Sequence, residues 1–241
     1  MNIADEIGGC TNLYPTIQQW AANLHQAGVS NLIVMPPTTA LFSDGTGSGR
    51  SAVDIWVVIP FQYDAEPAVV GQAIAKGDQV WSYNALMQDR YSPKWVLDYA
   101  PINFRIQPGF INQSLGLRGL TYWRIDQWTA DPWNDINTIN VGGYTYSGEG
   151  MMVYPGAQVG INGSAPSIRL KYLRDGSDDF EYIEMLKNLG YGAWALQVAK
   201  TVGPDWRNWT RDPNALEAAR IQLGQKLDTL NSTKGATLAR H

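Results

Sequence analysis

The sequence predicts an α/β fold built on a parallel β-sheet. Over residues 1–130, short apolar runs typical of strands alternate with segments of helical periodicity. The strand candidates are largely apolar rather than alternating, as in parallel strands that are covered on both faces. The chain has 241 residues, of which 44% are hydrophobic, which is enough for a substantial core.

The expected elements follow from periodicity and from the residues that end each segment. Five strand candidates occur, at residues 3–6, 31–35, 53–58, 79–83 and 119–124. The first helix should run from Pro15 to Ala27 and end at Gly28, and its apolar face is formed by Ile17, Trp20, Ala21 and Leu24. Further helices are expected at residues 67–76 and 101–115, and residues 43–51 form a loop.

The pattern changes after residue 130. Residues 131–166 are rich in Gly, Asn, Tyr and Pro and predict a long loop or an irregular hairpin. Two or three helices should follow within 167–231, among them 178–189 and 214–230, and residues 232–241 form a polar, flexible tail. We find neither an internal repeat nor a linker, so we expect one domain over 1–241.

Composition excludes several classes of protein. The net charge is −4 with only 18 Lys and Arg, which argues against nucleic acid and anionic membranes as partners. No apolar run approaches the ~18 residues of a membrane span, and the start does not resemble a signal peptide. One cysteine, Cys10, and two histidines, of which His25 is expected to be structural, give no basis for a disulfide framework or a metal site. We expect no cofactor: the glycine loop 45–49 lacks the spacing of a phosphate cradle, and the oxygen ligands in 131–137 lack that of a calcium loop.

Aromatic residues are the conspicuous surplus, with ten tryptophans and twelve tyrosines. Several stand at or near the ends of successive strand candidates, namely Trp56, Trp81, Tyr83, Trp123 and Trp128. A sugar ring stacks its apolar face on an aromatic side chain and needs polar partners for its hydroxyls, which Asp54, Asn84, Arg124, Asp126 and Glu149 could provide. Large aromatics are also common core residues, and we expect about half of these tryptophans to be packing residues.

Two adjacent acids, Asp5 and Glu6, end the first strand candidate. Neighbours on a regular strand point to opposite faces, so they can share a site only where the chain turns off the strand. That happens at the carboxyl ends of the strands of a (β/α) barrel, where catalytic residues lie. The alternative is a solvated pair near the start of the chain.

A series of motifs gives a family resemblance. It comprises Asp5-Glu6, Val53-Asp54-Ile55-Trp56, Tyr122-Trp123 with Trp128, Asp131-Pro132-Trp133, Gly148-Glu149-Gly150, Tyr154-Pro155-Gly156, Pro166 to Leu170, Leu173 to Gly176 and Asp179 to Tyr182. Over about residues 3–190 the chain resembles the C-terminal part of the catalytic domain of glycoside hydrolase family 123. The stretch from Pro166 to Tyr182 is the most specific part.

The resemblance implies a β-N-acetylgalactosaminidase-like enzyme in which the 2-acetamido group of the substrate attacks the anomeric carbon. In it, Glu6 matches the general acid/base, and Asp5 matches the carboxylate that orients the acetamido group. A general acid must carry a proton at the working pH, whereas its neighbour must stay ionised. Substrate assistance dispenses with an enzyme nucleophile. The resemblance also suggests a bacterial protein that acts outside the cytoplasm.

The chain differs from the family in lacking the preceding β-domain and the first barrel strands. Five strands instead of eight predict a half barrel over 1–130, with additional helices after it. We keep two alternatives to the substrate-assisted mechanism: a retaining glycosidase with Glu6 as acid/base and Glu149 as nucleophile, and a non-catalytic carbohydrate-binding remnant. An open half barrel would also expose its inward face, with residues such as Ile33, Ile55, Val57 and Val80, which favours a homodimer.

Overall fold

The computed structural model describes residues 1–86 and 88–238, and the chain divides into two compact units. Unit 1 consists of Met1–Asn84 and Gly116–Thr121, and unit 2 of Ala85–Leu115 and Tyr122–His241. The expectation of a single domain stays a prediction. In the expected tail, α8 continues as far as Leu238, and residues 239–241 lie outside the described residues.

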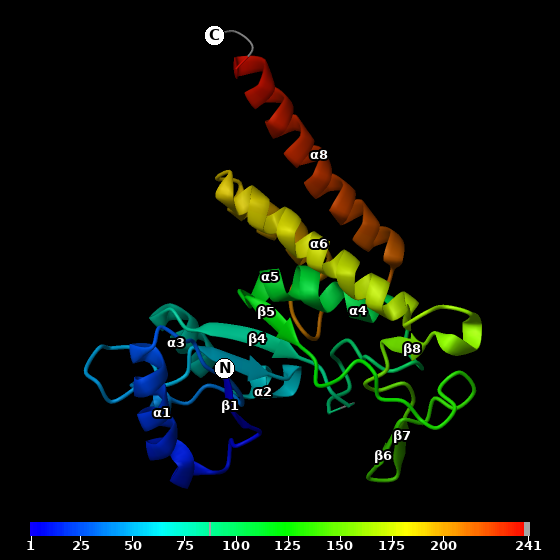
Figure 1. The fold of residues 1–241 in the computed structure, drawn as a ribbon. Coiled ribbons are helices and arrows are strands. Elements are labelled where there is room, and N and C mark those ends of the chain that lie inside the picture. The colour runs from blue at the N-terminus through cyan, green and yellow to red at the C-terminus, as the bar shows by residue number, and fades with distance from the viewer. Residues whose placement is uncertain (87, 239–241) are drawn as a thin grey trace. The chain divides into compact units, whose positions relative to one another are not determined.

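Unit 1 contains a five-stranded sheet in which every strand runs parallel to its neighbour (Figure 1). The strands follow one another across the sheet in chain order, as β1 (Asn2–Asp5), β2 (Leu32–Val34), β3 (Ile55–Val58), β4 (Gln79–Tyr83) and β5 (Gly119–Thr121). This confirms the α/β class and the five predicted strands. No pairing of β1 with β5 closes the sheet within the described residues, so it is an open sheet.

The helices of unit 1 begin and end largely where the sequence predicts. They are α1 (Tyr14–Gln26), α2 (Pro60–Ala65) and α3 (Pro67–Lys76), with short 3-10 turns at Thr11–Leu13 and Thr39–Leu41. Gly28, with φ 71°, and Gly77, with φ 96°, follow the ends of α1 and α3 in the left-handed region that glycine favours. The short helix α2 was not predicted. Trp20 is half-exposed, contrary to its predicted place on the apolar face of α1.

The register of the sheet corrects the predicted inward face. Ile33, Trp56 and Val80 are direct partners on β2, β3 and β4, so their side chains project to the same side. Ile55 and Val57 alternate with Trp56 and therefore project to the other side. Ile33, Val57 and Val80 are all fully buried within the single chain. An exposed apolar patch at these residues therefore no longer supports a homodimer. The homodimer itself stays a prediction.

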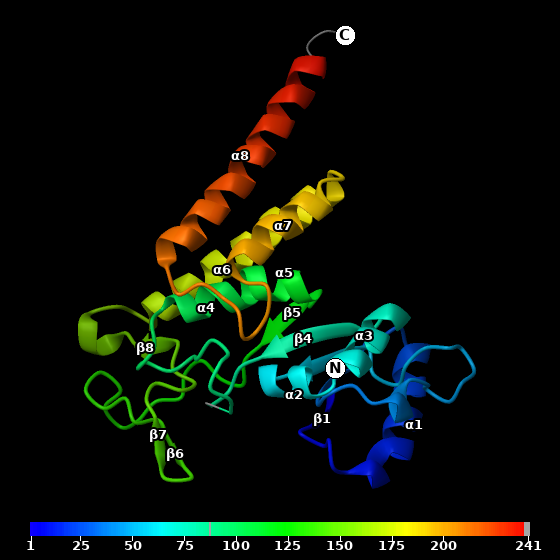
Figure 2. The same cartoon turned by 180° about the vertical axis from the view of Figure 1, so that it is seen from behind.

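Unit 2 is dominated by helices (Figure 2). They are α4 (Ile102–Ile106), a π-helical turn (Gln107–Ile111), α5 (Asn112–Leu115), α6 (Ile168–Asn188), α7 (Gly192–Val202) and α8 (Pro213–Leu238). The predicted helix at 101–115 is present, with the π turn at Pro108. Helix α6 starts ten residues before the predicted 178–189, and the Oγ of Ser167 accepts a hydrogen bond from the Leu170 N–H at its start. Within the described residues, no helix combines the length and the apolar character of a membrane span.

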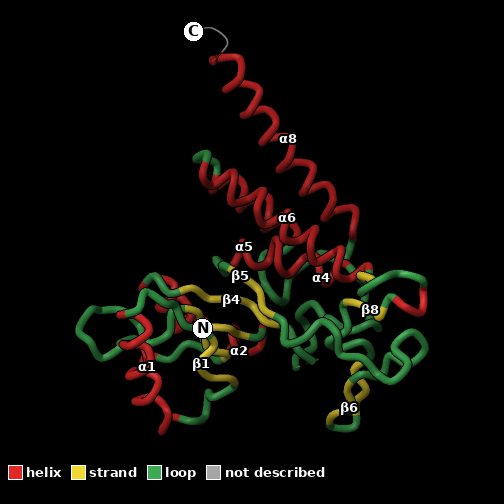
Figure 3. The backbone as a smooth tube through the Cα atoms, viewed as in Figure 1, coloured by secondary structure: helices red, strands yellow, loops and turns green. Residues whose placement is uncertain are grey.

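Residues 131–166 form mostly loops, as predicted, with two small hairpins among them (Figure 3). The first pairs β6 (Ile139–Val141) with β7 (Tyr144–Tyr146), and the second pairs β8 (Val153–Pro155) with β9 (Ser164–Pro166). A 3-10 turn, Ala157–Val159, lies within the second hairpin. Gly142 and Gly143 form the turn of the first hairpin with φ values of 60° and 80°, which a two-residue turn of this kind requires.

A glycine and a buried ionic cluster hold the helices of unit 2 together. A Cβ on Gly176 of α6 would lie 2.5 Å from the carbonyl oxygen of Arg105, so α4 and α6 cross closely only because this residue is glycine. Next to the crossing, Asp179 is fully buried and accepts hydrogen bonds from Arg105 at 2.6 Å and from Arg220 at 3.2 Å. These contacts join α4, α6 and α8 at one point.

We predict that Gly176→Ala destabilises the protein by about 1–3 kcal/mol, because the methyl group must displace backbone atoms in a packed crossing. The matched control is Gly224→Ala in α8, where the new Cβ would meet only the Tyr182 ring at 3.5 Å. That change should stabilise the helix by about 0.5–1 kcal/mol. Urea unfolding of both variants measures the difference, and equal stability of the two variants would contradict the close crossing.

Candidate active site

The acid pair lies at the carboxyl end of β1, where the chain leaves the strand. Asp5 is the last residue of β1 and pairs with Val34 of β2. Glu6 has a positive φ of 50°, which is uncommon for a residue other than glycine. Its N–H still donates to the Val34 carbonyl oxygen at 3.0 Å, so the turn starts at a fixed point on the neighbouring strand. This is the departure from regular strand geometry that two adjacent acids need if they are to serve one site.

Both acids are exposed, and neither carboxylate makes a hydrogen bond or an ion pair with any other residue that the structure describes. In parallel strands all carboxyl ends lie along one edge of the sheet, and the acids of β1 belong to that edge. A residue in a rare backbone conformation at such an edge is a reason to look for function there. The pair is open to solvent and free to contact a ligand.

The predicted residues of β4 also lie toward the carboxyl edge, but β2 and β3 separate β4 from β1. Tyr83 and Asn84 are buried, so they offer a ligand little surface. Trp81 is half-buried, and its indole N–H donates to the Gln79 side chain at 2.9 Å. Its ring packs against Gly119 of β5, where a Cβ would lie 2.6 Å from the ring.

Trp56 and Asp54 do not lie where a sugar site needs them. Trp56 is fully buried, its ring edge meets Phe42, and its indole N–H donates to Asp78 at 3.0 Å. No ring face is left for a sugar, so Trp56 is a core residue. Asp54 precedes β3 and therefore lies at the amino edge, opposite the acid pair.

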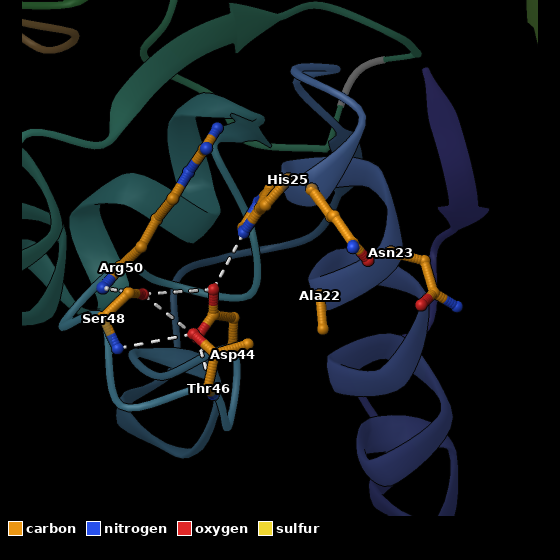
Figure 4. A pocket seen from close by; sticks show the side chains of 8 residues that line it. Ala22, Asn23, His25, Asp44, Thr46, Ser48 and Arg50 are labelled. Carbon is orange, nitrogen blue, oxygen red and sulfur yellow. Dashed lines mark hydrogen bonds and ion pairs between the residues drawn. The ribbon is translucent and has the colours of Figure 1, made fainter.

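The amino edge of unit 1 has a polar cavity of about 490 Å³ between α1 and the loop that contains Asp44 (Figure 4). His25 connects the two sides, with Nδ1 2.9 Å from Asp44 and Nε2 3.2 Å from Asp54. The loop wraps around Asp44, which accepts hydrogen bonds from the N–H and hydroxyl of Thr46 and from the Ser48 hydroxyl. Although burial alone would raise it, these bonds and the contact with His25 hold the pKa of Asp44 well below its usual range. The cluster fastens the loop to the helix, which agrees with the structural role expected of His25.

In unit 2, Glu149 is the centre of a second cluster. Its carboxyl group is fully buried, and Oε1 accepts hydrogen bonds from the Tyr122 hydroxyl and the Trp123 indole, both at 3.0 Å. The Tyr122 hydroxyl in turn accepts from the Gly150 N–H at 2.9 Å. Gly150, with φ 73°, leaves room for the Trp123 ring, from which a Cβ would be only 2.6 Å away. The Gly148-Glu149-Gly150 motif therefore fixes the position of Trp123.

Burial raises the pKa of the Glu149 carboxyl more than the hydrogen bonds from Trp123 and Tyr122 lower it. The backbone N–H of Leu86 also lowers this pKa, but less than burial raises it. Because burial penalises the ionised carboxylate, the protonated form is favoured. Glu149 thus holds the aromatic residues in place and has no surface for a sugar hydroxyl.

Three tryptophans of unit 2 are partly exposed while their indole N–H groups are held. Trp123, bound to Glu149, is 40% exposed, and Trp128, which donates to the Val153 carbonyl at 2.8 Å, is 38% exposed. Trp133, absent from the predicted site, is 37% exposed and donates to the Pro155 carbonyl at 2.9 Å. Each of these rings is fixed by its indole hydrogen bond and has an exposed part, so it can stack against the apolar face of a ligand. The sequence signal for Trp133 was its place in the Asp131-Pro132-Trp133 motif.

The other polar candidates of unit 2 lie at the surface. Asp126 is half-exposed and forms an ion pair with Arg124 at 2.7 Å. The segment that carries them is joined to the Glu149 loop by backbone contacts, including a bridge between Asp126 and Met151. Across the described residues, no group of three or more His, Cys, Asp or Glu is arranged to hold a metal ion.

The two units thus define an α/β chain with an acid pair at the edge of a parallel sheet and an aromatic-rich segment after it. The family profile for "Glycoside hydrolase 123, catalytic domain" matches residues 42–186. This match covers more than half of the chain, and the chain belongs to glycoside hydrolase family 123. Asp5 and Glu6 precede the matched range.

Among solved structures, the fold is similar to that of a family 123 glycoside hydrolase from Clostridium perfringens, studied for glycolipid glycan hydrolysis. The TM-score is 0.58 at 11% sequence identity, so the likeness concerns the fold. The alignment covers 90% of this chain but only 45% of the clostridial one, so this chain spans less than half the length of that protein. No curated protein matches the chain.

We predict that Glu149→Gln becomes increasingly stable relative to the parent as the pH rises. The folded-state pKa of Glu149 is raised, so its contribution to stability is complete below the unfolded-state pKa, about 4.3, and is lost as the pH rises through the folded-state value. Glutamine cannot ionise, and its carbonyl oxygen can accept both hydrogen bonds. The difference in unfolding free energy should grow by up to about 1.4 kcal/mol per pH unit in that interval.

Urea unfolding at pH 4, 6 and 8 measures this difference. The control is Glu181→Gln, which changes an exposed glutamate of α6 in the same unit. A stability difference that does not depend on pH for Glu149→Gln would show that Glu149 ionises as freely in the folded as in the unfolded chain.

Proposed function

We propose that the protein is a glycosidase of the β-N-acetylhexosaminidase type, with a retaining mechanism assisted by the 2-acetamido group of the substrate. The observation that carries this proposal is the exposed Asp5–Glu6 pair at the carboxyl end of a parallel strand, in a chain of family 123. The sheet of unit 1 is, in this proposal, one half of a (β/α) barrel. Catalytic residues of such barrels lie at the carboxyl ends of the strands.

In this mechanism Glu6 is the acid/base. The acetamido oxygen attacks the anomeric carbon, the bond to the leaving oxygen breaks, and Glu6 gives its proton to that oxygen. Asp5 orients the acetamido group and stabilises the positive charge of the oxazolinium intermediate. Water then attacks the anomeric carbon and returns a proton to Glu6, which restores the acetamido group and both carboxyl groups. No enzyme nucleophile is needed.

The role of the aromatic residues is to bind sugar rings. Trp123, Trp128 and Trp133 support it, because each has an exposed part of its ring and a fixed indole N–H. Asp126 at the surface can accept a hydrogen bond from a sugar hydroxyl. Trp81 and Asn84 keep the role assigned from the sequence as a weaker part of the proposal, since one is half-buried and the other buried.

The rival double-displacement mechanism needs Glu149 as a nucleophile. A nucleophilic carboxylate must reach the anomeric carbon in its ionised form. Glu149 is fully buried, one oxygen is occupied by two hydrogen bonds, and burial favours the protonated form. These observations favour substrate assistance. The third hypothesis, a non-catalytic carbohydrate-binding protein, predicts sugar binding without turnover, so turnover measurements distinguish it from both enzymatic mechanisms.

We predict that Glu6→Gln lowers kcat for the best chromogenic 2-acetamido glycoside about 10²–10⁴-fold, since general acid catalysis typically contributes this much. Glutamine keeps the size of the side chain, so folding and sugar binding should be retained. Glu66→Gln, an exposed glutamate of the same unit, is the control and should leave kcat unchanged. A Glu6→Gln variant within about threefold of the parent would remove Glu6 from the mechanism, and a parent without turnover but with sugar binding would favour the binding remnant.

A second prediction distinguishes the two mechanisms. With substrate assistance, Asp5→Asn should slow turnover of 2-acetamido glycosides, and a thiazoline analogue of the intermediate should inhibit the parent competitively. Asp228→Asn, an exposed aspartate of α8, serves as control. Rapid cleavage of plain glucosides or galactosides, together with indifference to the thiazoline, would establish the double displacement instead.

A further inference from the structure

A small pocket of unit 2, away from the tryptophans described above, has an unusual combination of side chains. It is formed by the loop before α4 and the segment between α7 and α8, and it has a volume of about 170 Å³. The two segments are joined by a hydrogen bond from the Trp209 indole to the Tyr91 carbonyl at 3.0 Å. We refer to it as the Arg90–Arg211 pocket.

The floor of this pocket is rigid and electrically balanced. Lys94 is buried and bound to Asp89 at 2.8 Å, and Asp89 also accepts hydrogen bonds from the Tyr91 and Ser92 N–H groups. Asn103 donates to the Lys94 carbonyl at 2.9 Å, which ties α4 to the same loop. The Lys94–Asp89 pair is neutral as a whole, so the net charge of the pocket is set by its other residues.

The rim of the pocket carries two arginines without a counter-ion. Arg90 and Arg211 are both exposed, and neither forms an ion pair with any residue in the described part of the chain. The guanidinium of Arg211 lies over the Trp209 ring at 4.2 Å, and among the described residues it makes only one hydrogen bond, a long one of 3.5 Å to the Trp209 carbonyl. The nearest acid in the chain, Asp212, is occupied as an acceptor for the Asn214 N–H at 2.9 Å.

Stacking on Trp209 orients the Arg211 guanidinium so that it can bind an oxyanion. The aromatic ring covers one face of the guanidinium and leaves its N–H donors free at the edge, which is the geometry for binding a carboxylate or a sulfate. Arg90 on the same rim provides a second set of donors. Tyr99 and Trp209 provide apolar surface beside these charges. A pocket of this size holds one sugar unit rather than an extended chain.

We infer that the Arg90–Arg211 pocket binds a sugar unit that carries a carboxylate or a sulfate group. The charge and the stacked arginine specify the oxyanion, whereas the choice of a sugar as its carrier rests on the proposed function. The pocket is an accessory binding site and not a place of bond cleavage. It would direct the protein towards acidic glycans.

The test is direct binding to the full chain, measured by calorimetry at low salt. The probes are methyl β-glucuronide and galactose 6-sulfate, each with its neutral counterpart, methyl β-glucoside and galactose. The acidic sugars should bind at least tenfold more tightly than the neutral ones, and the difference should shrink as salt is added. Equal affinities for acidic and neutral sugars would overturn the inference.

Two variants test the residues. Arg90→Ala and Arg211→Ala should each weaken binding of the acidic probes about tenfold, the usual share of one charge-assisted contact. Arg174→Ala, which changes an exposed arginine paired with Asp175 in α6, is the control and should bind normally. If Arg211→Ala disturbs folding through its contact with Trp209, Arg90→Ala alone decides, because the Arg90 side chain makes no hydrogen bond or ion pair with another described residue. Unchanged affinity in Arg90→Ala would overturn the assignment.

Binding of inorganic sulfate distinguishes recognition of the sugar from recognition of the anionic group alone. If sulfate alone binds as tightly as galactose 6-sulfate, the pocket is a plain anion site and the sugar part of the inference fails. The binding measurement needs no turnover, so it succeeds or fails independently of Asp5 and Glu6. In turn, Arg90→Ala should hydrolyse a neutral chromogenic glycoside as the parent does, since the pocket is not used by that substrate.

Discussion

The parallel direction of β1 to β5 is the constraint on which the functional interpretation depends. Because all five strands run the same way, every strand of unit 1 contributes its carboxyl end to one edge and its amino end to the other. Asp5 and Glu6 belong to the first edge, and the His25 cluster belongs to the second. The proposed catalytic pair and the structural His25 cluster therefore lie on opposite edges of the sheet, which is the arrangement that (β/α) barrels use.

Unit 2 shows how a buried carboxyl group can position a partly exposed aromatic residue without being exposed itself. Glu149 is buried, yet it accepts two hydrogen bonds that determine where the hydroxyl of Tyr122 and the ring of Trp123 lie. The glycines on either side of Glu149 have positive φ values. At each of them a Cβ would clash with neighbouring side chains. A sugar that stacks on Trp123 would meet a ring whose orientation is already fixed, so little side-chain entropy is lost on binding.

Much of the fold could be predicted because local signals and burial agree. Helix α3 and strand β4 have the predicted bounds, since Pro67 opens the helix, Gly77 closes it and an apolar run follows. The early start of α6 was missed because polar residues and a glycine interrupt the apolar residues of its first ten positions, and the helix has little amphipathic character. Its one clear signal was Ser167 at the cap.

The site was harder to predict, because neighbouring strand residues differ in burial in ways that a sequence does not record. Trp56 and Trp81 have the same residue type and similar strand positions, but one is enclosed by the core and the other lies over Gly119. Glu149 resembles a surface acid in the sequence, and only the structure places it behind Trp123. Asp5 and Glu6 were predicted to end the first strand, where the structure places them, but their proposed roles came from the family resemblance.

The backbone hydrogen bond from Glu6 to Val34 has a consequence for how the acid pair could be altered. The position of the Glu6 side chain is set by the main chain of β2, and no side-chain contact in the described residues corrects it. Substitutions that shift β2 along the sheet would therefore move the acid without touching it, and could alter turnover more than substrate affinity. For the proposed glycosidase, directed evolution would find second-site changes in residues 32–34, on the strand that pairs with β1.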